Sequence, residues 1–289
     1  MDGTERNRPV RLLTFAGAPV IKPSRARSDA VAIESAVLEY ERRDPIGAGR
    51  RDAVVMLHPW YGCFRFWDRT VEALPEYETF ALDLYSLGAR AGWEKFASPV
   101  GLSRAVEAFA DALRLERFSV IGNSMGGITA QELASRLGDR ISKLILVGTG
   151  ARIIGVKPDW RRAIDQWIAG EADRAFTERM VSALLARRPT DHEEFATFVD
   201  AVMSANKAFM GGVLTAAFDF DLRPALPRIK APTLVIRGEF DAARTPEHVA
   251  ELMAGIPNCC AHEIPGAGHS PQVDSPGAFC PLVRQFLQS

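Results

Sequence analysis

The sequence predicts an α/β fold with a mostly parallel central β-sheet flanked by helices. Short apolar runs typical of strands buried on both faces, such as residues 53–57 and 143–147, alternate with helical patterns such as residues 103–115. Strand signals stop at about residue 160, and helical patterns alone continue to about residue 218. Because 289 residues suffice for one large domain with an insertion, we expect one core interrupted by a helical segment.

The strands can be placed in order along the chain. The first 28 residues are polar and rich in proline and arginine, and we expect a loosely ordered leader. Mixed alternation indicates the first strands within residues 31–40. Further strands are expected at residues 53–57, 78–83, 118–121, 143–147, 233–237 and 260–264.

Composition excludes several classes of function. A hydrophobic content of 47% and a charged content of 25% are ordinary for a globular protein. The net charge of −1 gives no reason to expect binding to nucleic acid or to a membrane surface, and no apolar run approaches transmembrane length. The four cysteines lack metal-ligand spacing, so we expect reduced thiols in a cytoplasmic protein with no cofactor and no metal.

The most informative stretch is residues 118–138, where a strand pattern ends in Gly-Asn-Ser-Met-Gly-Gly and a helical pattern follows. Gly122 and Gly126 remove the Cβ atoms that would crowd a tight turn around Ser124. Such a turn lifts the serine hydroxyl above the sheet at a helix N-terminus, where free N–H groups favour negative charge. Strand, G-x-S-x-G and helix together resemble the nucleophile elbow of the α/β-hydrolase superfamily.

The resemblance implies an acid and a histidine later in the chain, in the order nucleophile, acid, base. Asp241 follows the strand at 233–237, and His269 follows the last strand in a Gly-His dipeptide. In this arrangement His269 removes the proton of Ser124 and later protonates the leaving group, and Asp241 orients the imidazole. We therefore expect Ser124, Asp241 and His269 to be the catalytic residues.

Two backbone N–H groups are expected to form the oxyanion hole. In the resembled family the loop after the first central strand usually reads His-Gly-x, whereas this chain has His58-Pro59-Trp60. Proline has no N–H, so the resemblance implies that Trp60, at the x position, is the donor, with Met125 as the second donor. We expect His58 to be a structural residue beneath this loop.

The resemblance also implies an α/β-hydrolase fold whose helical segment after the sixth strand is a cap over the active site. We divide the chain into a leader (1–28), a core (29–152 and 221–289) and a cap (153–220). The residues expected to contact substrate come from the loop after the first central strand, the elbow and the cap. They are Tyr61, Phe64, Asn123, Trp160 and Phe209. Each also has a plain alternative in packing or, for Asn123, in closing the turn. For Arg187 and Arg188 we favour a solvated helix end over contact with a substrate carboxylate.

The substrate is less well defined than the reaction. We expect a serine hydrolase that cleaves a small carboxylic ester or lactone through an acyl-enzyme intermediate. The elbow is similar to that of carbon–carbon bond hydrolases of meta-cleavage products, but Ser270 stands where those enzymes commonly have tryptophan. Residues 221–223 and 233–236 look equally like 3-oxoadipate enol-lactonases and related esterases. A receptor of this fold with little turnover, and a homodimer, are alternatives that the sequence leaves open.

Overall fold

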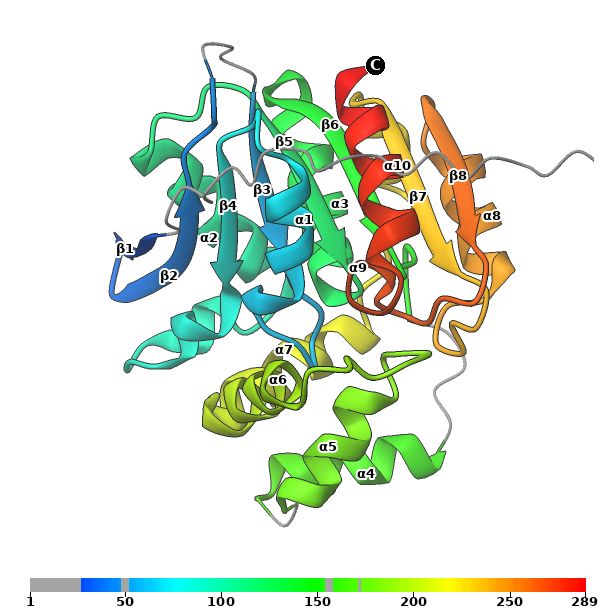
Figure 1. The fold of residues 1–289 in the computed structure, drawn as a ribbon. Coiled ribbons are helices and arrows are strands. Elements are labelled where there is room, and N and C mark those ends of the chain that lie inside the picture. The colour runs from blue at the N-terminus through cyan, green and yellow to red at the C-terminus, as the bar shows by residue number, and fades with distance from the viewer. Residues whose placement is uncertain (1–26, 48–51, 154–157, 171–172) are drawn as a thin grey trace, which may run out of the picture.

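The computed structural model describes residues 27–47, 52–153, 158–170 and 173–289. Within these ranges the chain forms an eight-stranded sheet with the strand order β1-β2-β4-β3-β5-β6-β7-β8 (Figure 1). The pairs β1–β2 and β2–β4 are antiparallel and the other pairs are parallel, so the predicted mostly parallel sheet is confirmed. The strands are β1 (Arg27–Ile33), β2 (Ala36–Arg43), β3 (Ala53–Leu57), β4 (Thr79–Asp83), β5 (Phe118–Asn123), β6 (Ile141–Val147), β7 (Thr233–Gly238) and β8 (Cys259–Ile264).

Helices cover both faces of the sheet. One face carries α1 (Asp68–Ala73), α9 (Pro271–Asp274) and α10 (Pro276–Gln288), which lie in front of the strands in Figure 1. The other face carries α2 (Pro99–Ala112), α3 (Met125–Leu137) and α8 (Pro246–Gly255). Short 3-10 helices complete the core: η1 (Phe64–Trp67), η2 (Leu84–Gly88), η3 (Trp93–Phe96), η4 (Gly138–Arg140) and η5 (Leu226–Arg228).

The central strands are apolar because they are buried on both faces. All five residues of β3 are buried, and their side chains alternate between two hydrophobic clusters. Val54 and Met56 join the cluster under α1 and α10, whereas Val55 and Leu57 join the cluster under α2 and α3. This alternation is the two-residue period of a strand.

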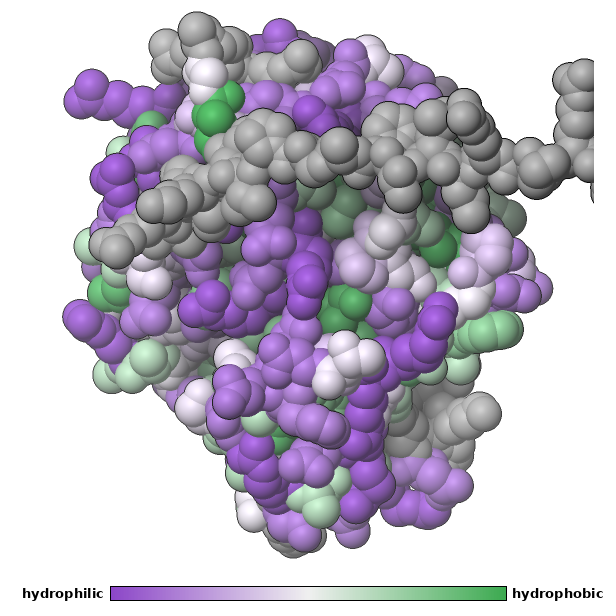
Figure 2. Space-filling model, in the orientation of Figure 1, coloured by the Kyte–Doolittle hydropathy of each residue, from purple (hydrophilic) through white to green (hydrophobic). Residues whose placement is uncertain are grey.

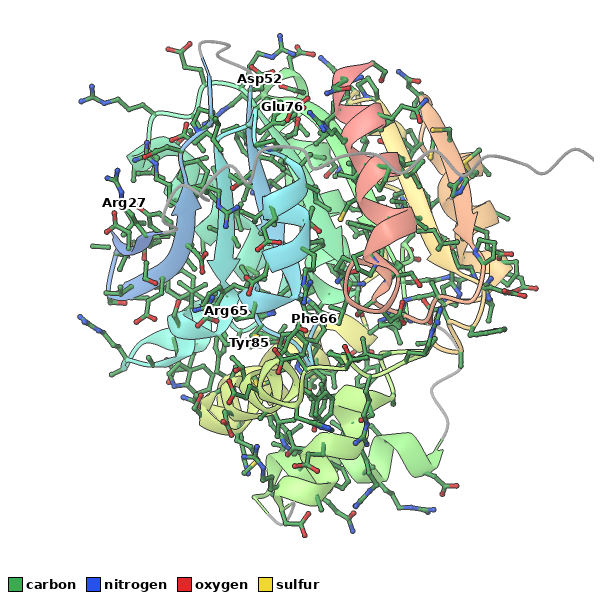
Figure 3. All side chains as sticks on the ribbon, viewed as in Figure 1. Arg27, Asp52, Arg65, Phe66, Glu76 and Tyr85 are labelled. Atoms are coloured by element: carbon green, nitrogen blue, oxygen red, sulfur yellow. The ribbon has the colours of Figure 1, made fainter. Side chains whose placement is uncertain are left out.

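In the described residues between β6 and β7, four α-helices lie beyond the carboxyl ends of the strands in Figure 1. They are α4 (Pro158–Ile168), α5 (Arg174–Ser182), α6 (His192–Ser204) and α7 (Lys207–Phe218). Aromatic contacts join two of them to the 3-10 helices that follow β3 and β4. Between ring centroids, Phe66 of η1 lies 4.4 Å from Phe198 of α6, and Tyr85 of η2 lies 6.3 Å from Phe209 of α7. Figure 3 labels Phe66 and Tyr85 at this junction.

Two predicted boundaries differ from the structure. Helix α2 begins at Pro99, four residues before the predicted start, because the Ser98 hydroxyl accepts the Gly101 N–H and proline favours the first helical position. Strand β1 begins at Arg27, inside the predicted leader, whose first 26 residues lie outside the described residues.

The face of the described residues that Figure 2 shows is largely polar. Hydrophilic residues cover most of the face shown in Figure 2, with hydrophobic residues scattered among them. Among the described helices, none combines the length and apolar character that crossing a membrane requires.

Candidate active site

Ser124 occupies a strained turn between β5 and α3. Its backbone has φ 54° and ψ −111°, a conformation that costs a non-glycine residue about 1–3 kcal/mol. The flanking glycines let the chain pack closely around it: a Cβ atom on Gly122 would lie 2.3 Å from the Gly126 carbonyl oxygen, and one on Gly126 would lie 2.2 Å from the Leu57 carbonyl oxygen. The sequence folds this way because glycines stand on both sides of the serine.

Two hydrogen bonds hold the main chain of Ser124, whereas its side-chain hydroxyl makes none in the described structure. The Ser124 N–H donates to the Val147 carbonyl at 2.9 Å, and the Ser124 carbonyl accepts from the Thr149 hydroxyl at 2.9 Å. Among the residues that the structure describes, the Ser124 hydroxyl has no hydrogen-bond partner. The side chain is therefore available to a reacting group.

Asp241 and His269 form a buried hydrogen-bonded pair on the loops after β7 and β8. His269 Nδ1 lies 2.8 Å from Asp241 Oδ2, and Asp241 Oδ1 accepts the N–H groups of Ala243 and Arg244 at 2.9 Å each. Burial alone would raise the pKa of Asp241, but His269 and these N–H groups outweigh it and lower the pKa below its ordinary value. Because an ionised carboxylate can only accept, Nδ1 carries the proton, and in the neutral ring Nε2 is the acceptor.

Asn123 joins the serine turn to the histidine loop. Its amide nitrogen donates to the Val147 and His269 carbonyls, both at 3.0 Å, and its oxygen accepts from Ser270 Oγ at 2.8 Å and Gln272 Nε2 at 2.9 Å. The side chain is fully buried and has no unused donor for a substrate. The structure thus corrects the expectation that Asn123 contacts substrate and favours its role in closing the turn.

The two expected oxyanion donors have free amides. Neither the Trp60 nor the Met125 N–H donates to any residue in the described part of the chain. Met125 is the first residue of α3, where N–H groups lack helical acceptors. Both the side chain and the main chain of Trp60 are held by hydrogen bonds. Its Nε1 donates to the Met210 carbonyl at 2.8 Å, and its carbonyl accepts from Tyr85 Oη at 2.6 Å.

His58 is held as a neutral structural residue. The Leu84 N–H donates to His58 Nε2 at 3.0 Å, so Nε2 is unprotonated, and Nδ1 donates to the Pro59 carbonyl at 2.9 Å. Asp83 Oδ1 lies 3.7 Å from Nε2, but the neutral ring makes no ion pair with it. These contacts fix the loop that carries Trp60 and agree with the structural role expected for His58.

The other predicted substrate residues do not form one group. Tyr61 is buried against Trp167 of α4, with ring centroids 5.2 Å apart, and its hydroxyl has no partner in the described structure. Phe209 is fully buried and packs on Tyr85. Phe64 lies apart from both, because it packs with the cluster under α1 and α10.

Three further predicted positions lie elsewhere. The side chain of Trp160 lies outside the described residues, although its backbone is part of α4. Arg187 and Arg188 are exposed and line an open surface cavity of about 550 Å³ beside the N-terminus of α10. Both arginines are exposed, as the favoured alternative states, but they lie in the segment between α5 and α6 and not at a helix end. No group of side chains with the spacing of a metal site occurs among the described residues.

The fold and the site together define a class of protein. A serine in a strained strand–helix turn, an Asp–His pair on loops after later strands and a mostly parallel sheet are the features of an α/β hydrolase. Comparison with protein families agrees, because the model of the "Alpha/beta hydrolase family" matches residues 54–282. The chain belongs to this family.

Individual relatives have different activities. A 2-hydroxy-6-oxononadienedioate/2-hydroxy-6-oxononatrienedioate hydrolase of Paraburkholderia xenovorans is 29% identical over 82% of this chain and 86% of its own length. A pimeloyl-[acyl-carrier protein] methyl ester esterase of Vibrio campbellii is 26% identical over 82% of this chain and 95% of its own. Among solved structures, the enol-lactonase from Burkholderia xenovorans superposes with a TM-score of 0.77 at 26% identity, over 90% of this chain and all of that chain.

Proposed function

We propose that the protein is a serine hydrolase that cleaves a small carboxylic ester or lactone through an acyl-enzyme intermediate. The observation that carries the proposal is the Asp241–His269 hydrogen bond, at 2.8 Å, on a loop that is itself bonded to Asn123, the residue before Ser124. These bonds support the proposal, because the reaction requires an oriented imidazole close to an activated serine hydroxyl.

The proposed reaction has two stages. Ser124 Oγ attacks the substrate carbonyl carbon while His269 Nε2 takes the hydroxyl proton. The Trp60 and Met125 N–H groups stabilise the oxyanion of the tetrahedral intermediate, which collapses when His269 returns the proton to the departing oxygen. Water, deprotonated by His269, then attacks the acyl-enzyme, releases the acid and restores Ser124.

The same residues support a second candidate reaction. Relatives include carbon–carbon bond hydrolases as well as the methyl ester esterase, at comparable identity. The enol-lactonase structure supports the ester or lactone reaction. We put ester or lactone cleavage first, because Ser270 follows His269 where the resembled carbon–carbon hydrolases commonly have tryptophan.

A substrate panel tests the proposal. Purified protein is assayed with p-nitrophenyl esters of increasing acyl length, with lactones and with a meta-cleavage dienoate, each beside the Ser124→Ala variant. We expect turnover of an ester or lactone, and a loss in Ser124→Ala of about 10⁴-fold or more in kcat at an unchanged unfolding temperature. Turnover of the dienoate alone would show that the protein is a carbon–carbon bond hydrolase and not an esterase or lactonase. Ester turnover that survives in Ser124→Ala would refute the mechanism.

A further inference from the structure

The segment between α5 and α6 lies directly on the loop that carries His269. The Ser270 N–H donates to the Leu184 carbonyl at 3.0 Å. A Cβ atom on Gly268 would lie 2.4 Å from the Ala186 nitrogen, so glycine is required for the two chains to approach this closely. The residues on both sides of His269 therefore touch the same short segment, residues 184–186.

A single carboxylate oxygen joins the two segments. Asp274 Oδ2 accepts the Ala186 N–H at 2.7 Å from the segment before α6, and the Gly268 N–H at 2.9 Å from the histidine loop. Asp274 is the last residue of the short helix α9, so its side chain reaches back across the loop in which His269 lies. Burial raises the pKa of Asp274, although the two N–H groups and Arg187 act in the opposite direction.

We infer that Asp274 is a positioning residue. Its carboxylate holds His269 in place by binding the histidine loop to residues 184–186, in the segment between helices α5 and α6. The inference rests on the proposed function, because it assigns a task to His269 in that reaction. It extends the function by making the placement of the base depend on the helices over the active site. Displacement of residues 184–186 releases one of the two N–H groups that Asp274 binds and loosens the loop around His269.

Other hydrogen bonds show why the carboxylate is needed here. The Asn123 amide restrains the loop from the elbow side, through the His269 carbonyl and the Ser270 hydroxyl. The loop after β7 restrains it through Asp241, which binds His269 Nδ1, and through the Phe240 N–H, which donates to the Ala267 carbonyl at 2.8 Å. Toward the segment before α6, the restraints are the Ser270 N–H bond to Leu184 and the two bonds to Asp274. Without Asp274, one backbone bond would remain between the loop and residues 184–186 in the described structure.

Steady-state kinetics test the inference. Asp274→Ala removes both bonds, whereas Asp274→Asn keeps the shape and one acceptor oxygen. Asp191→Ala is the matched control, because Asp191 also accepts two backbone N–H groups, those of Glu193 and Glu194, but only within its own helix start. We expect Asp274→Ala to lower the kcat of the Ser124-dependent reaction about 10- to 100-fold with KM changed less than about 3-fold. Asp274→Asn should recover most of the kcat, and Asp191→Ala should keep it. An unchanged kcat in Asp274→Ala, or an equal loss in Asp191→Ala, would overturn the inference.

Hydrogen exchange gives a readout that does not depend on activity. In Asp274→Ala we expect peptides covering residues 184–190 and 265–275 to lose protection together, by at least about 10-fold in exchange rate, while Asp191→Ala affects only the start of α6. If no substrate in the panel is turned over, the proposed function fails while this coupling can still be observed. If esters are turned over and the two segments exchange independently, the inference fails and the proposed function stands.

Discussion

The substitution Asn123→Asp tests how far the site depends on the network between the elbow and the histidine loop. The change keeps the side-chain shape and the oxygen that accepts from Ser270 and Gln272. It replaces the amide nitrogen, which donates to the Val147 and His269 carbonyls at 3.0 Å, by a second oxygen. Two hydrogen bonds thereby become close contacts between oxygen atoms at a fully buried position.

The cost can be worked out from these contacts. A buried donor or acceptor that loses its partner costs about 1–3 kcal/mol. The Val147 carbonyl keeps the Ser124 N–H, whereas the His269 carbonyl keeps no partner among the described residues, and the introduced oxygen faces two carbonyls and no donor. Two unpaired acceptors give an expected loss of about 2–6 kcal/mol in the free energy of unfolding. With an unfolding entropy of about 2.1 cal/mol/K per residue, 289 residues give a fall of roughly 3–10 °C in Tm.

The activity should fall as well, because the His269 loop loses its anchor to the serine turn. We expect kcat to fall about 10- to 100-fold at neutral pH. Burial raises the folded-state pKa of the introduced carboxyl above its unfolded value of about 3.9. The loss of unfolding free energy caused by ionising this carboxyl is therefore absent below about pH 3.9 and grows as the pH rises toward the raised pKa. The protonated form can donate one hydrogen bond, and part of the lost stability should return on acidification.

The measurements are chemical denaturation at several pH values and steady-state kinetics on p-nitrophenyl esters. Asn206→Asp is the control, because Asn206 also bonds through both ends of its amide, to the Phe209 N–H and the Gly88 carbonyl, at a position away from the loop. It should lose no more than about 1 kcal/mol and keep its kcat. If Asn123→Asp matches the wild type in both stability and kcat at neutral pH, the network does not position His269.

Two further predictions concern ionisable groups. Because the folded state lowers the pKa of Asp241, this residue contributes stability above its unfolded pKa of about 3.9, and the contribution is lost as pH falls through the folded value. The difference in unfolding free energy between wild type and Asp241→Asn should therefore shrink on acidification in urea titrations, and a constant difference from pH 7 to pH 3 would contradict this. For the thiols, burial raises the pKa of Cys63 to about 12 and that of Cys280 to about 11, whereas Cys260 is exposed. A disulfide reagent at pH 8 should modify Cys260 in a fast phase that Cys260→Ser removes, and should reach Cys63 and Cys280 only on unfolding; fast modification of either buried thiol in the folded protein would be the contrary result.

The elbow could be predicted from the sequence because everything that determines it is local. Gly122 and Gly126 stand within two residues of Ser124, and the close approaches that require them lie in the turn or on the adjacent strand β3. Strand β3 is a continuous apolar run for the same kind of reason, since all five of its residues are buried.

The distant hydrogen-bond partners of Asn123 could not be predicted in this way. Its partners Ser270 and Gln272 are 147 and 149 residues away, and no periodicity links positions at such a separation. Asp274 was missed for a similar reason, because one of its two donors, Ala186, belongs to a segment 88 residues earlier. The sequence offered one weak signal, polar residues at alternate positions after His269, namely Ser270, Gln272 and Asp274.

Phe64 shows a different limit. The loop from Trp60 to Trp67 is rich in aromatic residues, and the composition alone suggested one pocket wall. In the structure the loop turns into η1, and its rings divide between the two sides of the sheet: Phe66 joins Phe198 of α6, whereas Phe64 packs with the cluster under α1 and α10. A short 3-10 helix distributes successive side chains around its axis, and sequence alone does not show which of them faces the substrate.

The position of His269 in the sheet explains why so many non-local bonds meet around it. Ser124 follows β5, an interior strand whose six residues are all buried, so its turn is restrained by the packed core on both sides of the strand. His269 follows β8, which lies at the edge of the sheet and has four exposed residues among its six. Among the described strands β8 pairs with β7 alone, so the sheet holds the start of this loop from one side only. Asn123 on one side and Asp274 on the other supply the restraints that the strand does not, and the precision of the base therefore depends on residues that never touch the reacting atoms.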